Sequence, residues 1–317
     1  MTQRQYLTAL TQFLAWLLEK TIASRTREQW DHLLLDRIQH LWDEGAPRAL
    51  AERTIANLMW AAPSLRGKPS ISFPNATAAV AGWLKQEPGM SRPPVPFIVA
   101  RAIAMFLLQA KKPLHSLAIV FLFETYFRAS EGLATLALSI VPPAPMEART
   151  RQCVAILAMP TEMEEVSKTG ETDISVLLDL PRQADVGKVL IRLAATIRQM
   201  ERVFPISYQE LRQALMYAVA ELKLDGLSIS LHGLRHGGAS HDRSSNERTA
   251  AEVQMRGGWR QATSVKRYEK AARLNRQLAL IPEVSKARVY QLAKQLNDNF
   301  EKLYAEQLKL PPLAASY

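Results

Sequence analysis

Hydrophobic residues recur every three or four positions through the first 87 residues, which is the period of an amphipathic helix. A leucine stripe runs from Leu7 to Leu17, and comparable stripes cover residues 30–42, 50–59 and 76–84. None of these segments alternates with the period of two that a strand requires. We predict a small helical bundle with the stripes in its core. The alternative is that the first helix docks on a neighbouring subunit.

A proline-rich segment follows this helical region. Residues 87–96 contain four prolines, which interrupt helices and stiffen the chain. We therefore place a domain boundary near residue 90, so that residues 1–90 form one domain and residues 91–284 a second.

Beyond this boundary, the apolar pattern predicts helices interrupted by one β-hairpin. Helices are expected over residues 97–110, 114–127, 186–202, 207–222 and 285–308. The paired strands are expected at 151–159 and 173–180. The predicted fold class is mainly α with a small β-sheet or hairpin in the second domain. Residues 285–317 are set apart as a C-terminal helix and tail.

The charge of the chain favours a polyanionic partner. The formal net charge is +10, and residues 1–90 hold 10 Lys and Arg against 8 Asp and Glu. Most of the excess therefore lies after residue 90. A basic balance of this size suits DNA, RNA or an anionic membrane surface.

Other chemistries lack their usual sequence signals. Cys153 is the single cysteine, which excludes an intrachain disulfide and indicates a reducing compartment. No run approaches the about 20 apolar residues of a membrane helix, and Phe13–Leu18 is too short for a secretory signal, so we expect neither membrane insertion nor secretion. No metal-ligand spacing and no phosphate-binding Gly-x-x-x-x-Gly-Lys loop occurs, so neither a metal nor another cofactor is expected.

Five short motifs contain residues suited to phosphodiester chemistry. They are Arg128-Ala129-Ser130-Glu131, Ser167-Lys168-Thr169-Gly170, His232-Gly233-Leu234-Arg235-His236, Gly257-Gly258-Trp259 and Lys266-Arg267-Tyr268. Each alone is weak evidence, because an isolated His-x-x-Arg, a surface Arg–Glu pair or a tyrosine beside cations is usually structural. Their occurrence together, in this order, is what indicates a function.

The cationic residues match the needs of a phosphoryl-transfer transition state. Negative charge spreads over non-bridging oxygens there, and fixed cationic donors stabilise it. Arg128 and Arg235 suit this role because a guanidinium binds two oxygens and stays protonated. Lys168, in the turn between the predicted strands, can protonate the leaving 5′ oxygen.

The remaining motif residues complete a site for a covalent intermediate. His232 can donate to a phosphate oxygen or accept the tyrosine proton, and the Trp259 indole N–H is a donor only. Tyr268 is the nucleophile, and its phenol needs a cationic surrounding to react as phenolate. Lys266 and Arg267 supply local positive charge.

With these motifs, residues 92–275 resemble the tyrosine recombinases of the phage integrase family. The resemblance implies a helical core-binding domain (a SAM-like DNA-binding domain, here residues 1–90) and a catalytic domain at 91–284 that together clamp double-stranded DNA as a C. It also implies a 3′-phosphotyrosine intermediate formed without metal or ATP. A homo-tetramer on two DNA sites is expected, with residues 285–308 docked on the next subunit and an accessory DNA-bending protein as a candidate partner.

The same resemblance assigns supporting roles and raises two departures. Glu131 is expected to orient Arg128, and His236 to support the site or fill the core. Arg248, Arg256 and Arg260 are expected to be either contacts with the DNA backbone or solvated charges, and Lys266 and Arg267 are counted with the DNA contacts. Trp259 stands where a histidine is common, although some members carry tryptophan. Acidic residues at 162–165 precede Lys168, which is unusual beside DNA.

Three other functions compete with a site-specific recombinase. A type IB topoisomerase-like or telomere-resolving enzyme would share the phosphotyrosine chemistry. A non-catalytic DNA-binding protein could keep the fold, although it has no need of a nucleophile. A basic scaffold protein would account for the charge and not for the motif order. For the recombinase we expect a nucleoid location in a prokaryote or a nuclear one in a eukaryote. The biological reaction and the target sequence stay open.

Overall fold

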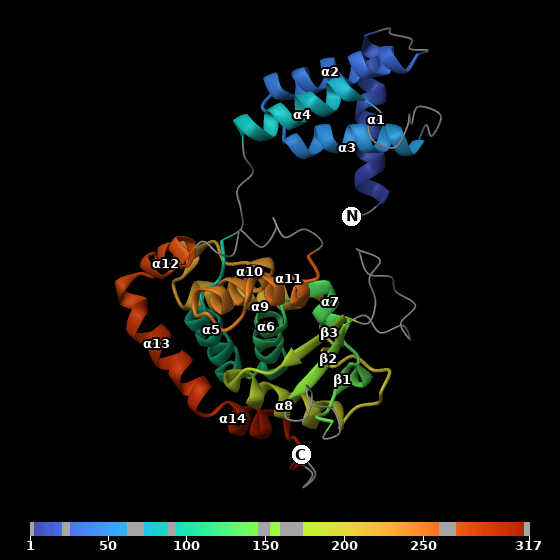
Figure 1. The fold of residues 1–317 in the computed structure, drawn as a ribbon. Helices are drawn as coiled ribbons and strands as arrows, with labels where there is room; N and C mark the ends of the chain where they lie inside the picture. The colour runs from blue at the N-terminus through green and yellow to red at the C-terminus, as the bar shows by residue number, and fades with distance from the viewer. Residues whose placement is uncertain are drawn as a thin grey trace. The chain divides into compact units, whose positions relative to one another are not determined.

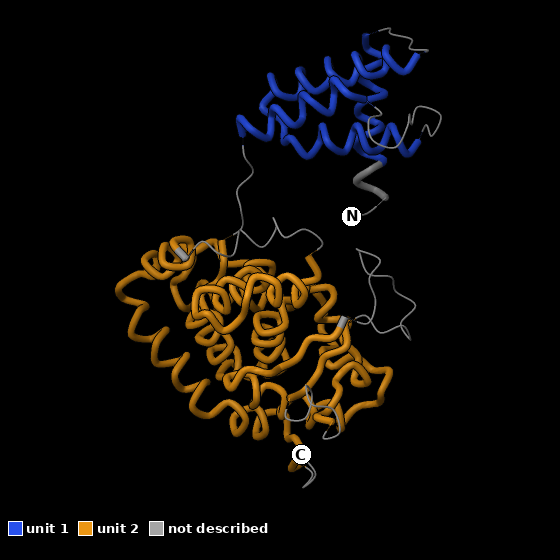
Figure 2. The backbone as a smooth tube through the Cα atoms, in the orientation of Figure 1, with its two compact units in different colours: residues 1–91 blue, residues 92–317 orange. Residues whose placement is uncertain are grey.

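Two compact units make up the chain. The computed structural model describes residues 3–20, 26–61, 73–87, 93–144, 153–158, 174–259 and 271–313. Unit 1 covers residues 1–91 and unit 2 covers residues 92–317 (Figure 2). The division lies next to the boundary expected near residue 90.

Unit 1 is helical throughout its described residues (Figure 1). Its helices are α1 (Gln3–Glu19), α2 (Arg27–Asp43), α3 (Arg48–Ala61) and α4 (Pro74–Gln86). A capping box fixes the start of α2. Thr26 Oγ1 accepts the backbone N–H of Gln29, and the Gln29 side chain accepts the backbone N–H of Thr26.

The face of α1 that enters the core differs from the predicted leucine stripe. Phe13 and Leu17 are buried, whereas Leu7 and Leu14 are 53% and 44% exposed. Apolar residues occur on more than one side of this helix, and the side that carries the aromatic rings is the buried one. The expectation that the whole stripe forms the core was therefore wrong for Leu7 and Leu14.

Unit 2 surrounds a pair of apolar helices. In chain order its helices are α5 (Phe97–Gln109), α6 (Pro113–Thr125), α7 (Ala129–Leu133), α8 (Ala184–Ala194), α9 (Tyr208–Glu221), α10 (Leu231–Ser244), α11 (Ala250–Arg256), α12 (Ala271–Ala279), α13 (Glu283–Asp298) and α14 (Phe300–Leu308). Short 3-10 turns are found at Ala137–Ser139, Pro181–Gln183 and Asp225–Leu227. The apolar character of α5 and α6 on all sides is typical of helices enclosed by others.

A small antiparallel sheet lies at one side of unit 2 (Figure 1). Its strands, in spatial order, are β1 (Ile140–Val141), β2 (Val154–Ala158) and β3 (Ile174–Leu178). Ile156 stands opposite Val176 on β3 and Ile140 on β1. The prediction of a mainly helical fold with a small sheet is confirmed.

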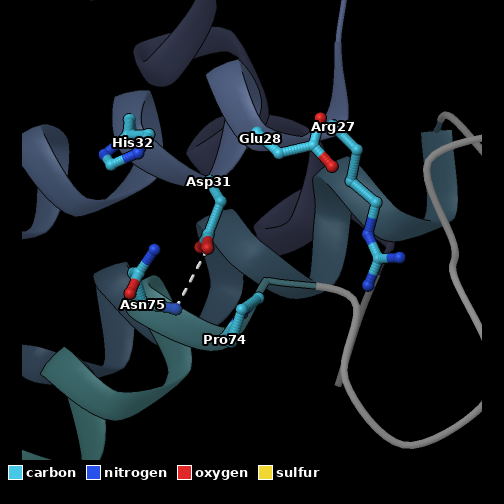
Figure 3. Close-up of a pocket in the computed structure, with 6 residues that line it drawn as sticks. All are labelled: Arg27, Glu28, Asp31, His32, Pro74 and Asn75. Carbon is cyan, nitrogen blue, oxygen red and sulfur yellow. Dashed lines mark hydrogen bonds between the residues drawn. The ribbon is translucent and has the colours of Figure 1, made fainter.

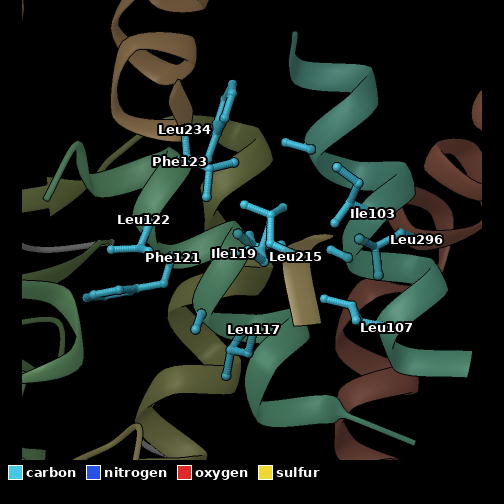
Figure 4. Packing of buried hydrophobic residues seen from close by; sticks show 14 of the residues in the cluster. Ile103, Leu107, Leu117, Ile119, Phe121, Leu122, Phe123, Leu215, Leu234 and Leu296 are labelled. Atoms are coloured by element: carbon cyan, nitrogen blue, oxygen red, sulfur yellow. The ribbon is translucent and has the colours of Figure 1, made fainter. Parts of the chain in front are cut away.

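The C-terminal segment belongs to the core of its own chain. Instead of one helix over 285–308, the structure has α13 and α14, and α13 packs along α5. Leu296 lies beside Ile103 and Leu107 in this core (Figure 4). The apolar side chains of this segment are thus buried largely within unit 2, and docking of residues 285–308 on a neighbouring subunit stays a prediction.

Close approach of α6 and α10 sets the position of the motif residues. A Cβ on Gly238 of α10 would lie 2.0 Å from the carbonyl oxygen of Phe123 at the end of α6. The first turn of α10 is capped by Ser230 Oγ, which accepts the N–H of Gly233 at 3.1 Å. The carbonyl of Gly233 in turn accepts the N–H of Val95 at 3.0 Å, which fastens the start of unit 2 to α10.

Candidate functional site

Three motif residues from distant parts of the sequence meet near the start of α7. Arg128 precedes α7, Arg235 lies on α10, and Trp259 follows α11. The Arg235 guanidinium carbon is 4.6 Å from the centre of the Trp259 ring, and Glu131 contacts both arginines. The structure therefore brings Arg128, Arg235 and Trp259 together, as the motif order predicts.

Arg235 is held in a fixed position from two sides. It is 3% exposed and donates hydrogen bonds to the carbonyl oxygens of Tyr126 and Gly257. Its Nη1 also lies 3.9 Å from Glu131 Oε2. A buried guanidinium anchored in this way is rigid, which favours electrostatic stabilisation of a bound anion without rearrangement.

Glu131 orients the more exposed arginine. Its Oε1 forms an ion pair with Arg128 Nη1, and its Oε2 accepts the backbone N–H of Arg128 at 2.8 Å. The Arg128 side chain is 31% exposed, so solvent reaches part of it. The orienting contact expected of Glu131 is present.

Contact with Gly257 and hydrogen bonds of its own backbone position Trp259. The backbone N–H of Trp259 donates to the backbone carbonyl of Gln254 at 3.1 Å, and the Gln254 side-chain amide donates to the backbone carbonyl of Trp259 at 3.0 Å. A Cβ on Gly257 would lie 2.1 Å from the Trp259 ring, so a residue with a side chain there would force the ring to shift. The ring stacks on Tyr126 with centroids 6.4 Å apart and planes inclined by 27°.

The two histidines of the motif share one face of α10. His232 lies one turn before Arg235, and its ring centroid is 4.6 Å from that of His236. Both rings are half-buried. His236 is therefore in contact with a candidate site residue rather than enclosed in the core.

Five of the predicted site residues lie outside the described residues: Lys168, Arg260, Lys266, Arg267 and Tyr268. The helices and strands that flank these segments in the chain are described. Lys168 belongs to the segment that joins β2 to β3. Tyr268 precedes α12 by three residues, and α12 contacts α10, the helix of His232 and Arg235.

Arg248 and Arg256, assigned to DNA contacts from the sequence, are bonded to other residues of unit 2. Arg248 is 8% exposed and pairs with Asp179 and, at 3.1 Å, with Asp242. Arg256 is equally buried and donates to the carbonyl oxygen of Glu124 at 2.6 Å and to that of Leu177 at 2.5 Å. Burial lowers the pKa of Arg256. Both guanidinium groups are bonded inside unit 2, and their contact with backbone phosphates stays a prediction.

A buried ionic network behind the site was not foreseen from the sequence. Glu124 has no exposed surface and pairs with Arg101 at 2.7 Å and Arg182 at 3.2 Å, while Gln183 donates to it at 2.8 Å. Burial would raise the pKa of Glu124, but the two arginines outweigh burial and lower it. The signal in the sequence was one charged residue within each of two apolar helical stretches, Arg101 and Glu124. Charged residues are rarely buried unless they are paired, so these two could have been expected to pair.

The network reaches the site through Asp242 and Tyr126. Asp242 on α10 pairs with Arg182 at 2.6 Å and accepts a hydrogen bond from the Tyr126 hydroxyl. Tyr126 is fully buried and ends α6 in the left-handed conformation, with φ of 59°. Burial and the nearby Asp242 raise the pKa of Tyr126 well above its usual range, so its hydroxyl stays protonated.

Unit 1 has a separate open pocket of about 280 Å³ (Figure 3). It is lined by Arg27, Glu28, Asp31, His32, Pro74 and Asn75. The Asp31 carboxylate accepts the backbone N–H groups of Asn75 at 3.0 Å and Ala76 at 2.9 Å, so it caps α4 from the neighbouring helix. This pocket is explained by helix capping.

Two kinds of feature are absent from the described residues. Among them, no group of three or more His, Cys, Asp or Glu side chains is arranged to hold a metal ion. Within the same ranges, no helix has the length and apolar character required to cross a membrane.

No protein-family model matches the chain, and no curated protein matches it.

Proposed function

We propose that this chain is a site-specific tyrosine recombinase that cuts and rejoins DNA. The observation that carries the proposal is that Glu131 contacts both Arg128 and Arg235, and that Arg235 lies over the Trp259 ring. These residues come from separate segments, and a structural role for each alone would not require that they meet. Two arginines and an indole N–H are donors without acceptor capacity, which suits an anionic ligand.

In the proposed reaction, the anion is the scissile phosphate. The Tyr268 phenolate attacks phosphorus as the bond to the 5′ oxygen breaks, and Lys168 delivers the proton that the leaving oxygen needs. Arg128, Arg235 and Trp259 bind the non-bridging oxygens, and His232 donates to one of them or accepts the phenol proton. Rejoining reverses these steps, because the phosphotyrosine bond retains the energy of the broken linkage.

The proposed assembly follows the same resemblance. Units 1 and 2 clamp double-stranded DNA as a C, and four chains act on two DNA sites, aided where needed by a DNA-bending protein. The division into a helical unit 1 and a motif-bearing unit 2 supports this arrangement. The enzyme acts where chromosomal DNA lies, in a prokaryotic nucleoid or a eukaryotic nucleus.

The decisive experiment is capture of a covalent protein–DNA adduct that resists SDS. Nicked suicide substrates made from DNA flanking the gene trap the intermediate, because the short cleaved strand diffuses away. Wild type should form the adduct, and Tyr268→Phe should form none while binding DNA with nearly unchanged affinity. Tyr290→Phe, which alters an exposed tyrosine on α13, is the matched control and should react as wild type.

Each alternative function has its own outcome. Adduct formation by Tyr268→Phe at the wild-type level would refute the assignment of the nucleophile. DNA binding by wild type without any adduct would favour a non-catalytic DNA-binding protein. Relaxation of supercoiled plasmids regardless of their sequence would favour a type IB topoisomerase-like enzyme.

A further inference from the structure

Tyr126 occupies a backbone conformation that is unfavourable for a bulky side chain. Its φ of 59° lies in the left-handed region, which costs a residue other than glycine about 1–2 kcal/mol. Glycine would relieve this cost at the end of α6. A fully buried tyrosine at such a position suggests that its ring or hydroxyl has a role that offsets this cost.

Every part of Tyr126 contacts the candidate site or the network behind it. Its carbonyl accepts a hydrogen bond from Arg235, and its ring stacks on Trp259. Its hydroxyl donates to Asp242, and the Arg256 guanidinium carbon lies 5.2 Å from its ring centre. One residue therefore connects two groups of the proposed phosphate pocket with the buried ions.

The two contacts from α10 hold Tyr126 at both ends. Arg235 and Asp242 are seven residues apart, which is close to two helical turns and places them on one face. One binds the main chain of Tyr126 and the other its phenol. Asp242 is itself fixed by Arg182 at 2.6 Å and Arg248 at 3.1 Å, so the phenol is tied to a rigid acceptor.

We propose that Tyr126, anchored by Asp242, is a positioning residue that holds Arg235 and Trp259 in the geometry needed for phosphodiester cleavage. Tyr126 does not touch the reacting atoms and acts through these two side chains. This inference rests on the proposed function. Through Tyr126, the buried ion pairs of Asp242 affect the rate of cleavage, a role that neither the charge of the chain nor the order of its motifs indicates.

The test compares two buried tyrosines that lose the same hydroxyl. Tyr126→Phe keeps the ring and leaves Asp242 with both arginines. Tyr304→Phe is the matched control, since Tyr304 is also fully buried and its hydroxyl bonds to Ser116 Oγ at 2.5 Å within the hydrophobic core. Both substitutions remove one buried hydrogen bond, so a purely structural role predicts similar behaviour.

The readout separates catalysis from binding. With protein in excess over a suicide substrate, Tyr126→Phe should slow adduct formation at saturation by about tenfold or more, as small displacements of catalytic groups do. Its affinity for DNA should stay at the wild-type value, and Tyr304→Phe should react at the wild-type rate. Equal rates for Tyr126→Phe and wild type would overturn the inference and leave the proposed function intact. If wild type forms no adduct, the proposed function fails and the inference falls with it.

A second measurement reads the geometry without requiring turnover. Fluorine NMR of the chain labelled with fluorotryptophan gives signals from six tryptophans, and Trp259→Phe assigns the relevant one. Tyr126→Phe should shift or broaden that signal, and Tyr304→Phe should leave it in place. An unmoved Trp259 signal in Tyr126→Phe would contradict positioning through the stacked ring.

Discussion

Replacement of Gly238 by alanine should destabilise unit 2, although alanine is the better helix former. In an unconstrained helix the change would stabilise by about 1 kcal/mol. Here the new Cβ would lie 2.0 Å from the carbonyl oxygen of Phe123 and 2.8 Å from the Tyr126 ring. To reach ordinary contact at 3.4 Å, the end of α6 must retreat from α10 by roughly 1.4 Å.

Such overpacking usually costs about 1–3 kcal/mol, and backbone atoms yield less readily than side chains. We expect a net loss of about 2 kcal/mol, or a fall in Tm of about 4–8 °C for a unit of this size. Differential scanning calorimetry of the full chain measures it. Gly82→Ala in α4 is the matched control, because its Cβ meets nothing within 4 Å and it should stabilise unit 1 slightly.

The reasoning fails if Gly238→Ala melts at or above the wild-type temperature. That result would mean that α6 and α10 are not packed as closely as the Gly238 environment requires. A fall in Tm with Gly82→Ala of the same size would instead attribute the effect to alanine itself. The expected pattern is therefore opposite signs in the two helices.

Three further predictions follow from the buried charges and the proposed ligand. Arg101→Met should lower the free energy of unfolding of unit 2 by about 3 kcal/mol at pH 7, because Glu124 loses one of its two paired arginines. Because the pKa of Glu124 is lowered in the folded state, its ionised carboxylate stabilises the fold above its usual pKa of 4.5, and this stability is lost as the pH falls through the folded-state pKa. The difference in free energy of unfolding between wild type and Arg101→Met, measured with urea, should therefore be smaller at acid pH. An equal difference at pH 3 and pH 7 would contradict this. Asp31→Ala should cost unit 1 about 1–2 kcal/mol by uncapping α4, which thermal unfolding measures, and an unchanged Tm would refute the capping role. Affinity for DNA should fall steeply with salt in a fluorescence-anisotropy titration, and a salt-independent affinity would count against a DNA ligand.

The sequence predicted most helices because their apolar period is local information. The expected helices at 97–110 and 207–222 correspond to α5 and α9 within a residue. The one expected over 186–202 ends at Ala194 instead, and Arg202 pairs with Leu136 in an isolated β-bridge. That pairing joins residues far apart in the chain, so no local pattern could indicate it.

The order of the motifs indicated that Arg128, Arg235 and Trp259 lie near one another, and they are linked in the structure through Glu131 and Arg235. Their catalytic roles stay predictions. The burial of Arg248 and Arg256 was not foreseen, because a count of charges carries no information on burial. Tyr126 was missed because its importance depends on partners on α10 and after α11.

The segment that opens unit 2 has a mechanical consequence for the helix of Arg235. Prolines stiffen the chain at Pro93–Pro96, and the N–H of Val95 is bonded to the Gly233 carbonyl in the first turn of α10. A displacement of the backbone at Val95 is therefore passed to the first turn of α10 through this hydrogen bond. The start of unit 2 and the helix that carries Arg235 are thus joined by the main chain, independently of the side chains in the core.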